Sequence, residues 1–331
     1  MTPVVSILIA NWNGRDVLRD CLASVRDMTR DLAYEVIVVD DASTDDSAAM
    51  VRREFPGVRL VVRTSNGGFV RANNEGIRNA QGTYVFLLNS DTLLLNNAAK
   101  ILSDYLDAHP HVGICGGWLK NPDGSDQISF GTAPSMAEAL AGALFLNDLF
   151  PSMGFPGRGM RPRAGTTESR RVGYISGADL MIRGSLVARM GLFDERFEAY
   201  CEEVDLCRRV RTETGLEVHF VPGARIVHLA GLSYGKLSER RLRIQYESYF
   251  TFLTKYHGAW YARGVLLLYA WQYALKGVFR SARIVTAPDA LHDLRRAEAR
   301  SALQHVRQSV RAATRRLRSP GEVSGRSRRS L

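Results

Sequence analysis

Acidic residues follow two apolar segments of this sequence, at the points where strands are expected to end. Tyr84–Leu88 is a run of five apolar residues, typical of a strand buried on both faces, and Asp91 comes shortly after it. A second apolar segment, Tyr34–Val39, leads directly into Asp40 and Asp41. In open α/β sheets the carboxyl ends of the strands form the ligand crevice, so a carboxylate there could hold a divalent cation against a diphosphate. The alternative for Asp91 is that it caps the next helix or shapes a turn.

A second acidic group lies in the later half of the chain, where Glu202, Glu203 and Asp205 begin a helix expected to run to about Glu213. Three carboxylates so close together repel one another unless a cation, an arginine or water relieves the repulsion. A carboxylate whose pKa is raised by such neighbours could act as a general base. The alternative is an exposed acidic helix start, which the helix dipole favours.

A regular alternation of strands and helices must position these residues. We expect strands at Val4–Ala10, Tyr34–Val39, Val58–Val62, Tyr84–Asn89 and Val112–Trp118, with helices between them. This alternation predicts an α/β fold with a largely parallel sheet that is covered on both faces. Beyond an irregular region with one helix near Met136–Leu146, we expect ordered structure to return over Val172–Arg183 and short strands at Val218–Val221 and Arg225–His228. Helices over Glu239–Tyr256 and Trp260–Phe279 follow.

The composition is that of an ordinary globular protein, with 331 residues of which 45% are hydrophobic and 24% charged. The four cysteines form no Cys-x-x-Cys pair and no zinc-like cluster with histidines, so the sequence suggests neither a disulfide framework nor a structural metal site. No secretory signal is recognisable at the N-terminus. We therefore expect an intracellular protein in a reducing compartment.

The positive charge is concentrated at the C-terminal end. Of the net charge of +10, +9 lies between Arg280 and Leu331, where 13 arginines stand against four acidic residues. Such a tail suits anionic lipid or nucleic acid, or is a solvated helical surface. We expect an anionic membrane surface, and no nucleic acid, as its partner.

The aromatic helix before this tail supports membrane contact. Its 12 uncharged residues between Arg263 and Lys276 correspond to about 18 Å of helix, against about 30 Å for a hydrocarbon core. The helix is therefore too short to span a membrane but suits its interface, and packing against the rest of the protein is the alternative. We expect a domain over residues 1–256, an amphipathic basic helical region over 257–318 and a disordered basic tail over 319–331.

Two phosphate-binding motifs are absent and one hydrolase motif is present. The sequence contains no G-x-G-x-x-G after the first strand and no G-x-x-x-x-G-K-[ST]. Gly231-Leu232-Ser233-Tyr234-Gly235 matches the G-x-S-x-G pattern of a serine hydrolase. The acid and the histidine that should follow are found only as Asp289 and His292, in the basic tail, so this alternative is weak.

Seven motifs, in the same order, resemble those of family 2 glycosyltransferases: Asn11-Trp12-Asn13-Gly14, Val38-Val39-Asp40-Asp41-Ala42-Ser43-Thr44-Asp45, Asn66-Gly67-Gly68-Phe69, Asn73-Asn74, Leu87-Leu88-Asn89-Ser90-Asp91-Thr92, Ser176-Gly177-Ala178 and Glu202-Glu203-Val204-Asp205-Leu206. The sequence is most similar to the rhamnosyltransferase-like branch of that family. The resemblance extends from about Val4 to Tyr256. It implies a GT-A fold, a nucleotide-sugar donor, a divalent cation (Mg²⁺ or Mn²⁺) and inversion at the anomeric carbon.

The resemblance also assigns roles to single residues. Asp41 would bind the pyrimidine base, and Asp91 would be the metal-binding last acid of the family's D-x-D motif, whose first position is Asn89 here. Glu203 takes the position of the general base, with Glu202 and Asp205 orienting the acceptor or a loop. His228 resembles a histidine that some members use near the metal, and a buried structural histidine is an equal alternative. The motifs put these residues against the donor: Asn11, Asn13, Asp40, Asp41, Asn66, Gly68, Phe69, Asn73 and Asn89. They put Ser176 and Gly177 against the acceptor.

The expected function follows from these roles. The protein would move one sugar, rhamnose from dTDP-rhamnose, onto a glycan or polyprenyl-linked acceptor in cell-surface polysaccharide biosynthesis, and would lie peripherally at the inner face of the cell membrane. A UDP-sugar donor is the alternative within the family. A serine hydrolase using Ser233 and a non-catalytic nucleotide-sugar or membrane-binding protein are the alternatives from other classes.

Overall fold

The computed structural model describes residues 3–146, 159–160, 162, 165–229, 239–285 and 292–314. The chain divides into two compact units, the first of residues 1–133 and 156–248, and the second of residues 134–155 and 249–331. Ser233 and residues 315–331 lie outside the described residues. The expected domain boundary after residue 256 and the expected disordered tail stay predictions.

The first unit is built on a nine-stranded sheet with the strand order β3-β2-β1-β4-β11-β6-β12-β5, and with β9 paired to β12. The strands are β1 (Val5–Asn11), β2 (Tyr34–Asp40), β3 (Arg59–Val62), β4 (Tyr84–Leu88), β5 (Thr92–Leu94), β6 (Val112–Lys120), β9 (Arg170–Arg171), β11 (Asp179–Arg183) and β12 (Glu217–His228). A small second sheet joins β7 (Phe130–Gly131), β8 (Gly159–Met160) and β10 (Tyr174–Ile175). The helices of this unit are α1 (Arg15–Met28), α2 (Ser47–Glu54), α3 (Phe69–Ile77), α4 (Ala98–Ala108), α7 (Gly184–Met190), α8 (Glu202–Thr214) and the first half of α9 (Glu239–His257).

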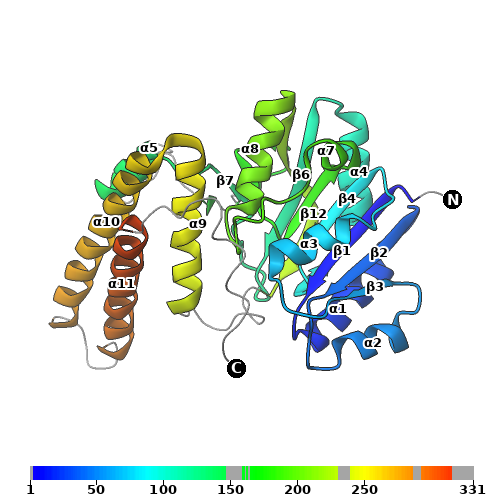
Figure 1. Ribbon diagram of the computed structural model, residues 1–331, viewed down its shortest axis with the longest axis horizontal. Coiled ribbons are helices and arrows are strands. Elements are labelled where there is room, and N and C mark those ends of the chain that lie inside the picture. Colours follow the sequence, from blue (N-terminus) through cyan, green and yellow to red (C-terminus); the bar gives the residue numbers. More distant parts are fainter. Residues whose placement is uncertain are drawn as a thin grey trace. The chain divides into compact units, whose positions relative to one another are not determined.

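Helices cover both faces of the sheet because alternate residues of its strands point to opposite sides. Ile7 and Ile9 share one buried cluster with Leu18 of α1. Leu8 points the other way, toward α3, where a Cβ added at Gly76 would lie 2.2 Å from Leu8 Cδ1. The absent side chain at Gly76 therefore lets α3 pack closely on β1, and Figure 1 shows α3 beside this strand. The predicted α/β fold with two covered faces is confirmed.

The sheet is parallel from β3 to β4 and between β6 and β12, but β11 and β5 run antiparallel to their neighbours. The expected ordered segment Val172–Arg183 consists of two strands, β10 and β11, separated by a turn at Ser176–Ala178. The prediction of two strands over Val218–His228 was wrong, because both belong to β12, whose pairing with β6 is irregular between Phe220 and Arg225.

The second unit is helical in its described part, with α5 (Met136–Ala143), the end of α9, α10 (Ala259–Val285) and α11 (His292–Ala313). α10 and α11 lie side by side (Figure 1), and α5 packs on α10. α10 continues six residues beyond the predicted end at Phe279. Among the described residues, no helix is both long enough and apolar enough to cross a membrane.

Candidate active site

The polar residues predicted to act together lie at one edge of the sheet. β1 pairs in parallel with β2 and with β4, and the last residues of β1 and β2, Asn11 and Asp40, are partners in register. Asp41 directly follows β2, and Asn89 directly follows β4. The carboxyl ends of these strands therefore bring Asn11, Asp40, Asp41 and Asn89 to the same edge, as the sequence predicted.

Asp40 shapes the loop that leaves β2. It is buried, its Oδ1 accepts a hydrogen bond from Asn11 Nδ2 at 3.2 Å, and its Oδ2 accepts one from the Ser43 backbone N–H at 3.0 Å. Asn13 joins the same loop, since the Thr44 N–H donates to Asn13 Oδ1 at 2.7 Å. Asn11 Oδ1 is buried and has no hydrogen-bond partner in the described part of the chain, so this amide oxygen is open to a donor group of a ligand.

Asp41 holds the Asn66–Phe69 turn. One carboxylate oxygen accepts hydrogen bonds from the N–H groups of Gly67 and Gly68 at 3.0 and 2.7 Å, and the other lies 2.8 Å from Arg63 Nε. Gly68 has a φ of +84°, which an L side chain adopts only with strain. Asn73 Nδ2 then donates to the Phe69 carbonyl at 2.9 Å within α3. Asp41 thus fixes the backbone of the Asn66–Phe69 turn, which the family resemblance places against the donor.

Asp91, Asn89 and His228 form the second cluster at this edge. The antiparallel pairing of β5 with β12 places His228 opposite Thr92, so that His228 Nε2 lies 3.3 Å from Asp91 Oδ1 and 3.3 Å from Asn89 Nδ2. Asp91 is only 5% exposed. The sequence spacing of 137 positions between Asp91 and His228 gives no sign of this contact, which β5 and β12 create together.

Gln127 determines which nitrogen of His228 carries hydrogen. Its Nε2 donates to Asn121 Oδ1 at 2.8 Å and to the His228 carbonyl at 3.1 Å, which leaves Gln127 Oε1 to accept from His228 Nδ1 at 2.6 Å. In the neutral ring Nε2 then presents a lone pair toward the carboxylate of Asp91. This lone pair can accept a hydrogen bond from Asn89 Nδ2, 3.3 Å away, or bind a cation beside the Asp91 carboxylate, so Asp91 and His228 fit a divalent cation.

Glu202 and Glu203 begin α8 directly after a strained turn. Tyr200 and Cys201 both have a φ of +66°. Residues other than glycine adopt this backbone conformation at a cost of about 1–3 kcal/mol each, and such residues cluster at functional sites. The Oε2 atoms of both glutamates are buried and have no hydrogen-bond partner among the described residues. Burial raises the pKa of Glu203 to about 7. Burial and the neighbouring Glu203 carboxylate raise the pKa of Glu202 well above its usual range. Both carboxyl groups therefore favour the protonated form more strongly than an exposed glutamate does.

The turn Ser176–Ala178 connects the glutamates to the cluster of Asp91, Asn89 and His228. A Cβ added at Gly177 would lie 3.7 Å from Glu203 Cβ, and the Asn89 N–H donates to the Ala178 carbonyl at 3.1 Å. Ser176 is held from the other side, because its N–H donates to the Ser129 carbonyl at 2.9 Å. The two predicted acceptor-binding residues, Ser176 and Gly177, therefore lie between the general-base candidate and the end of β4.

Asp205 has a different environment from the two glutamates. It is fully buried and binds Arg209 at 2.9 Å, and Arg209 also donates to the carbonyls of Met190 and Leu192. Asp205 therefore holds the loop after α7 through Arg209, and its orienting role in the reaction stays a prediction. Sequence reasoning missed Gln127 and Arg63. No motif marks Gln127, whereas an arginine directly after a predicted strand was a signal for Arg63.

The fold and this site define a glycosyltransferase of the GT-A type. Residues 6–164 match the family described as glycosyl transferase family 2, so the chain contains a domain of that family. It is 27% identical over 272 residues to N-acetylglucosaminyl-diphospho-decaprenol L-rhamnosyltransferase of Mycobacterium tuberculosis, covering 79% of this chain and 87% of that protein. The predicted likeness to the rhamnosyltransferase-like branch is confirmed.

Two solved structures show the same fold. The mannosyltransferase PcManGT of Pyrobaculum calidifontis, in complex with GDP-Man and Mn²⁺, superposes with a TM-score of 0.54 at 18% identity, over 94% of this chain and 87% of that one. GalNAc-T7 with UDP, GalNAc and Mn²⁺ superposes with a TM-score of 0.55 at 15% identity, over 93% of this chain and 57% of that one. The GT-A fold expected from the sequence is therefore confirmed.

Proposed function

We propose that this glycosyltransferase moves rhamnose, with inversion, from dTDP-rhamnose to a polyprenyl-linked or polysaccharide acceptor. The relative from M. tuberculosis is a rhamnosyltransferase whose name specifies a decaprenol-linked acceptor, which supports both halves of the proposal. The observation that carries it is the connection of Asp91 and His228, through Asn89 and the Ser176–Ala178 turn, to the buried carboxyl of Glu203.

Each group has a defined part in the transfer. Asp91 and His228 would hold Mg²⁺ or Mn²⁺, which when bound supplies positive charge for the departing diphosphate. The Mn²⁺ in both solved neighbours supports a divalent cation. Asp41 and the turn that it holds would contact the pyrimidine base, with Asn11 Oδ1 as a further acceptor.

Glu203 would act as the general base. An acceptor hydroxyl beside Ser176 and Gly177 loses its proton to Glu203 Oε2 as its oxygen attacks the anomeric carbon from the face opposite the diphosphate. The raised pKa of Glu203 suits this transfer near neutral pH, since a base works best when its pKa lies near the operating pH.

A panel of nucleotide sugars, tested by thermal shift with and without Mn²⁺ or Mg²⁺, tests donor and metal together. We expect dTDP-rhamnose to raise the melting temperature, and more so with the cation. A larger rise in melting temperature with a UDP-sugar would indicate that the UDP-sugar, and not dTDP-rhamnose, is the donor. Mass spectrometry of a reaction with a polyprenyl-diphosphate-linked sugar should then show one added deoxyhexose. Donor binding without any product would instead support a non-catalytic binding protein.

We also propose that α10 binds an anionic membrane surface. Trp260, Leu267, Trp271 and Val278 lie on one face of this helix by their spacing, and each is more than half exposed, Trp260 at 83%. Arg263 lies over the Trp260 ring at 5.0 Å, which puts a cation beside the apolar stripe. Exposed aromatic and aliphatic side chains with neighbouring cations are typical of interfacial helices.

Co-sedimentation with vesicles tests this surface. We expect the full chain to bind vesicles that contain anionic lipid, and the double variant Trp260→Ala/Trp271→Ala to bind at least tenfold more weakly. Met28→Ala, which removes an exposed apolar side chain of α1, is the matched control and should bind like the unchanged protein. Equal binding by all three proteins would contradict the proposal.

A further inference from the structure

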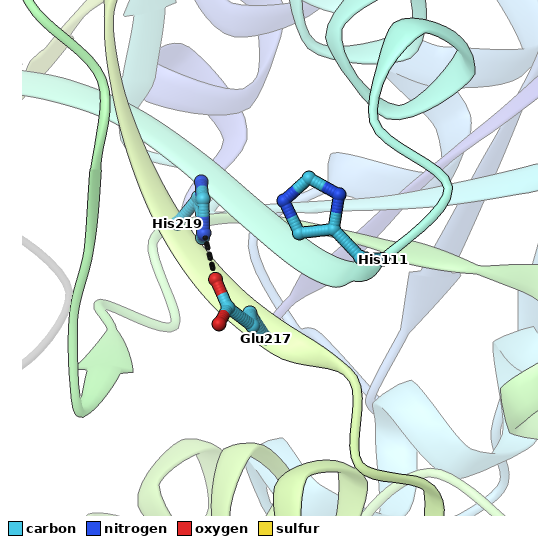
Figure 2. A group of neighbouring side chains, drawn as sticks. All are labelled: His111, Glu217 and His219. Carbon is cyan, nitrogen blue, oxygen red and sulfur yellow. Dashed lines mark hydrogen bonds and ion pairs between the residues drawn. The ribbon is translucent and has the colours of Figure 1, made fainter.

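A cluster of metal-binding side chains lies far from the catalytic edge. His111 immediately precedes β6, while Glu217 and His219 lie at the start of β12, the strand whose other end carries His228. His219 and His228 are nine positions apart on β12, which is roughly 30 Å of extended strand. One ligand atom from each of His111, Glu217 and His219 falls within 4.8 Å of the others, and Figure 2 shows the His111 ring beside the hydrogen-bonded pair.

The sheet brings these residues together although the sequence separates them. Glu217 pairs with Val112 in the parallel register of β6 and β12, and its N–H donates to the His111 carbonyl at 2.9 Å. Glu217 and His219 are two positions apart on one strand, so their side chains leave the same face. The backbone positions are thus fixed before any ligand arrives, and the three side chains need only small adjustments to close on a cation.

The surrounding groups orient the His219 ring for a metal. Its Nε2 lies 2.7 Å from Glu217 Oε2, and its Nδ1 lies 2.8 Å from the Tyr105 hydroxyl. The hydroxyl can donate to Nδ1 or accept a hydrogen from it, so the ring can release the Nε2 proton and still keep a hydrogen bond at Nδ1. Arg171 binds the other oxygen of Glu217 at 3.4 Å, which leaves Oε2 directed at the histidines.

The donor set selects the kind of cation. Two imidazole nitrogens and one carboxylate oxygen suit Zn²⁺ and similar transition metals, whereas Mg²⁺ prefers oxygen ligands. Ligand atoms about 2.0–2.1 Å from a tetrahedral Zn²⁺ lie about 3.4 Å from one another. The Nε2–Oε2 distance of 2.7 Å must therefore open by about 0.7 Å as the cation enters.

We propose that His111, Glu217 and His219 form a second metal site, which binds Zn²⁺ or a cation of the same preference and leaves a fourth position to water. Such a site joins the segment between α4 and β6 to the start of β12, 106 positions further along the chain. It is separate from Asp91 and His228 in position and in the metal that it prefers. The catalytic edge and this site can therefore be filled with different cations at the same time.

Calorimetric titration of the chelator-treated full chain with Zn²⁺, in excess Mg²⁺, tests the proposal. We expect one tight Zn²⁺ per chain and a higher melting temperature. His111→Ala, which changes an exposed residue and should leave folding and transfer activity intact, should weaken this binding about 100-fold, within the range that loss of a metal-site contact produces. Glu217→Gln should weaken it as well, and Co²⁺ in its place should give the visible spectrum of a tetrahedral site.

Two matched variants separate this site from other binding. His109→Ala removes a neighbouring histidine that stacks on Tyr105 but is not among the three ligands, and it should leave Zn²⁺ affinity unchanged. Asp91→Asn should also leave it unchanged. Tight Zn²⁺ binding that survives in His111→Ala and Glu217→Gln, or that is lost in Asp91→Asn instead, would overturn the proposal, and so would the absence of tight binding in the unchanged protein.

Discussion

The substitution Glu203→Gln should remove catalysis and at the same time stabilise the protein. Burial raises the pKa of Glu203 from an ordinary 4.5 to about 7, and this difference corresponds to at most about 3 kcal/mol of folding free energy. A carboxyl group whose pKa is higher in the folded state favours folding most below the unfolded pKa. Its stabilising contribution is lost as the pH rises toward 7 and beyond. Glutamine carries no charge, so Glu203→Gln should unfold at a higher denaturant concentration than the unchanged protein at pH 8, with little difference at pH 4.

The same variant changes the pH dependence of transfer. In the unchanged protein kcat/KM should rise with pH through about 7, as Glu203 loses its proton. Loss of the general base should lower kcat by roughly 10²–10⁴-fold and remove this rise. Glu202→Gln is the matched control at the neighbouring position of α8, because it leaves the Glu203 carboxyl in place and the rise should remain. If Glu203→Gln kept the rise in rate, or Glu202→Gln abolished it, the assignment of the base would be wrong.

Three further substitutions probe the rest of the site. Gln127→Ala removes the hydrogen-bond acceptor of His228 Nδ1. It should raise the Mn²⁺ concentration needed for half-maximal activity about 10–100-fold, and activity should recover at high Mn²⁺. An unchanged Mn²⁺ requirement would speak against a cation at Asp91 and His228. Gly68→Ala introduces a side chain at a φ of +84° and should cost about 1–2 kcal/mol in urea unfolding while weakening donor binding; full stability and affinity would show that the turn tolerates it. Asp179→Asn should be more stable than the unchanged protein at pH 8 but not at pH 4, since burial raises the pKa of Asp179 well above its usual range; equal stability at both would refute this.

Local pattern was enough for the first half of the fold. The strands around Ile7, Val38 and Phe86 were predicted because each is a short apolar run bounded by turn residues. Parallel strands joined by helices end at a common edge, so Asp40, Asp41 and Asn89 were expected to lie together. The antiparallel β11 was not foreseen, because it follows a long irregular region and nothing in its own residues determines which strand it will join.

The sequence alone determined which residues could do chemistry: the acids after β2 and β4, and the acidic start of α8. Those assignments depend on residue type and on short spacing, which a sequence displays directly. Only the tertiary structure decided which of them meet. His228 lies beside Asp91, Gln127 sets its hydrogen, and Gly177 lies against Glu203 because strands distant in the sequence pair in one sheet. For the same reason His111 reaches Glu217 and His219, a contact that no local spacing could have revealed.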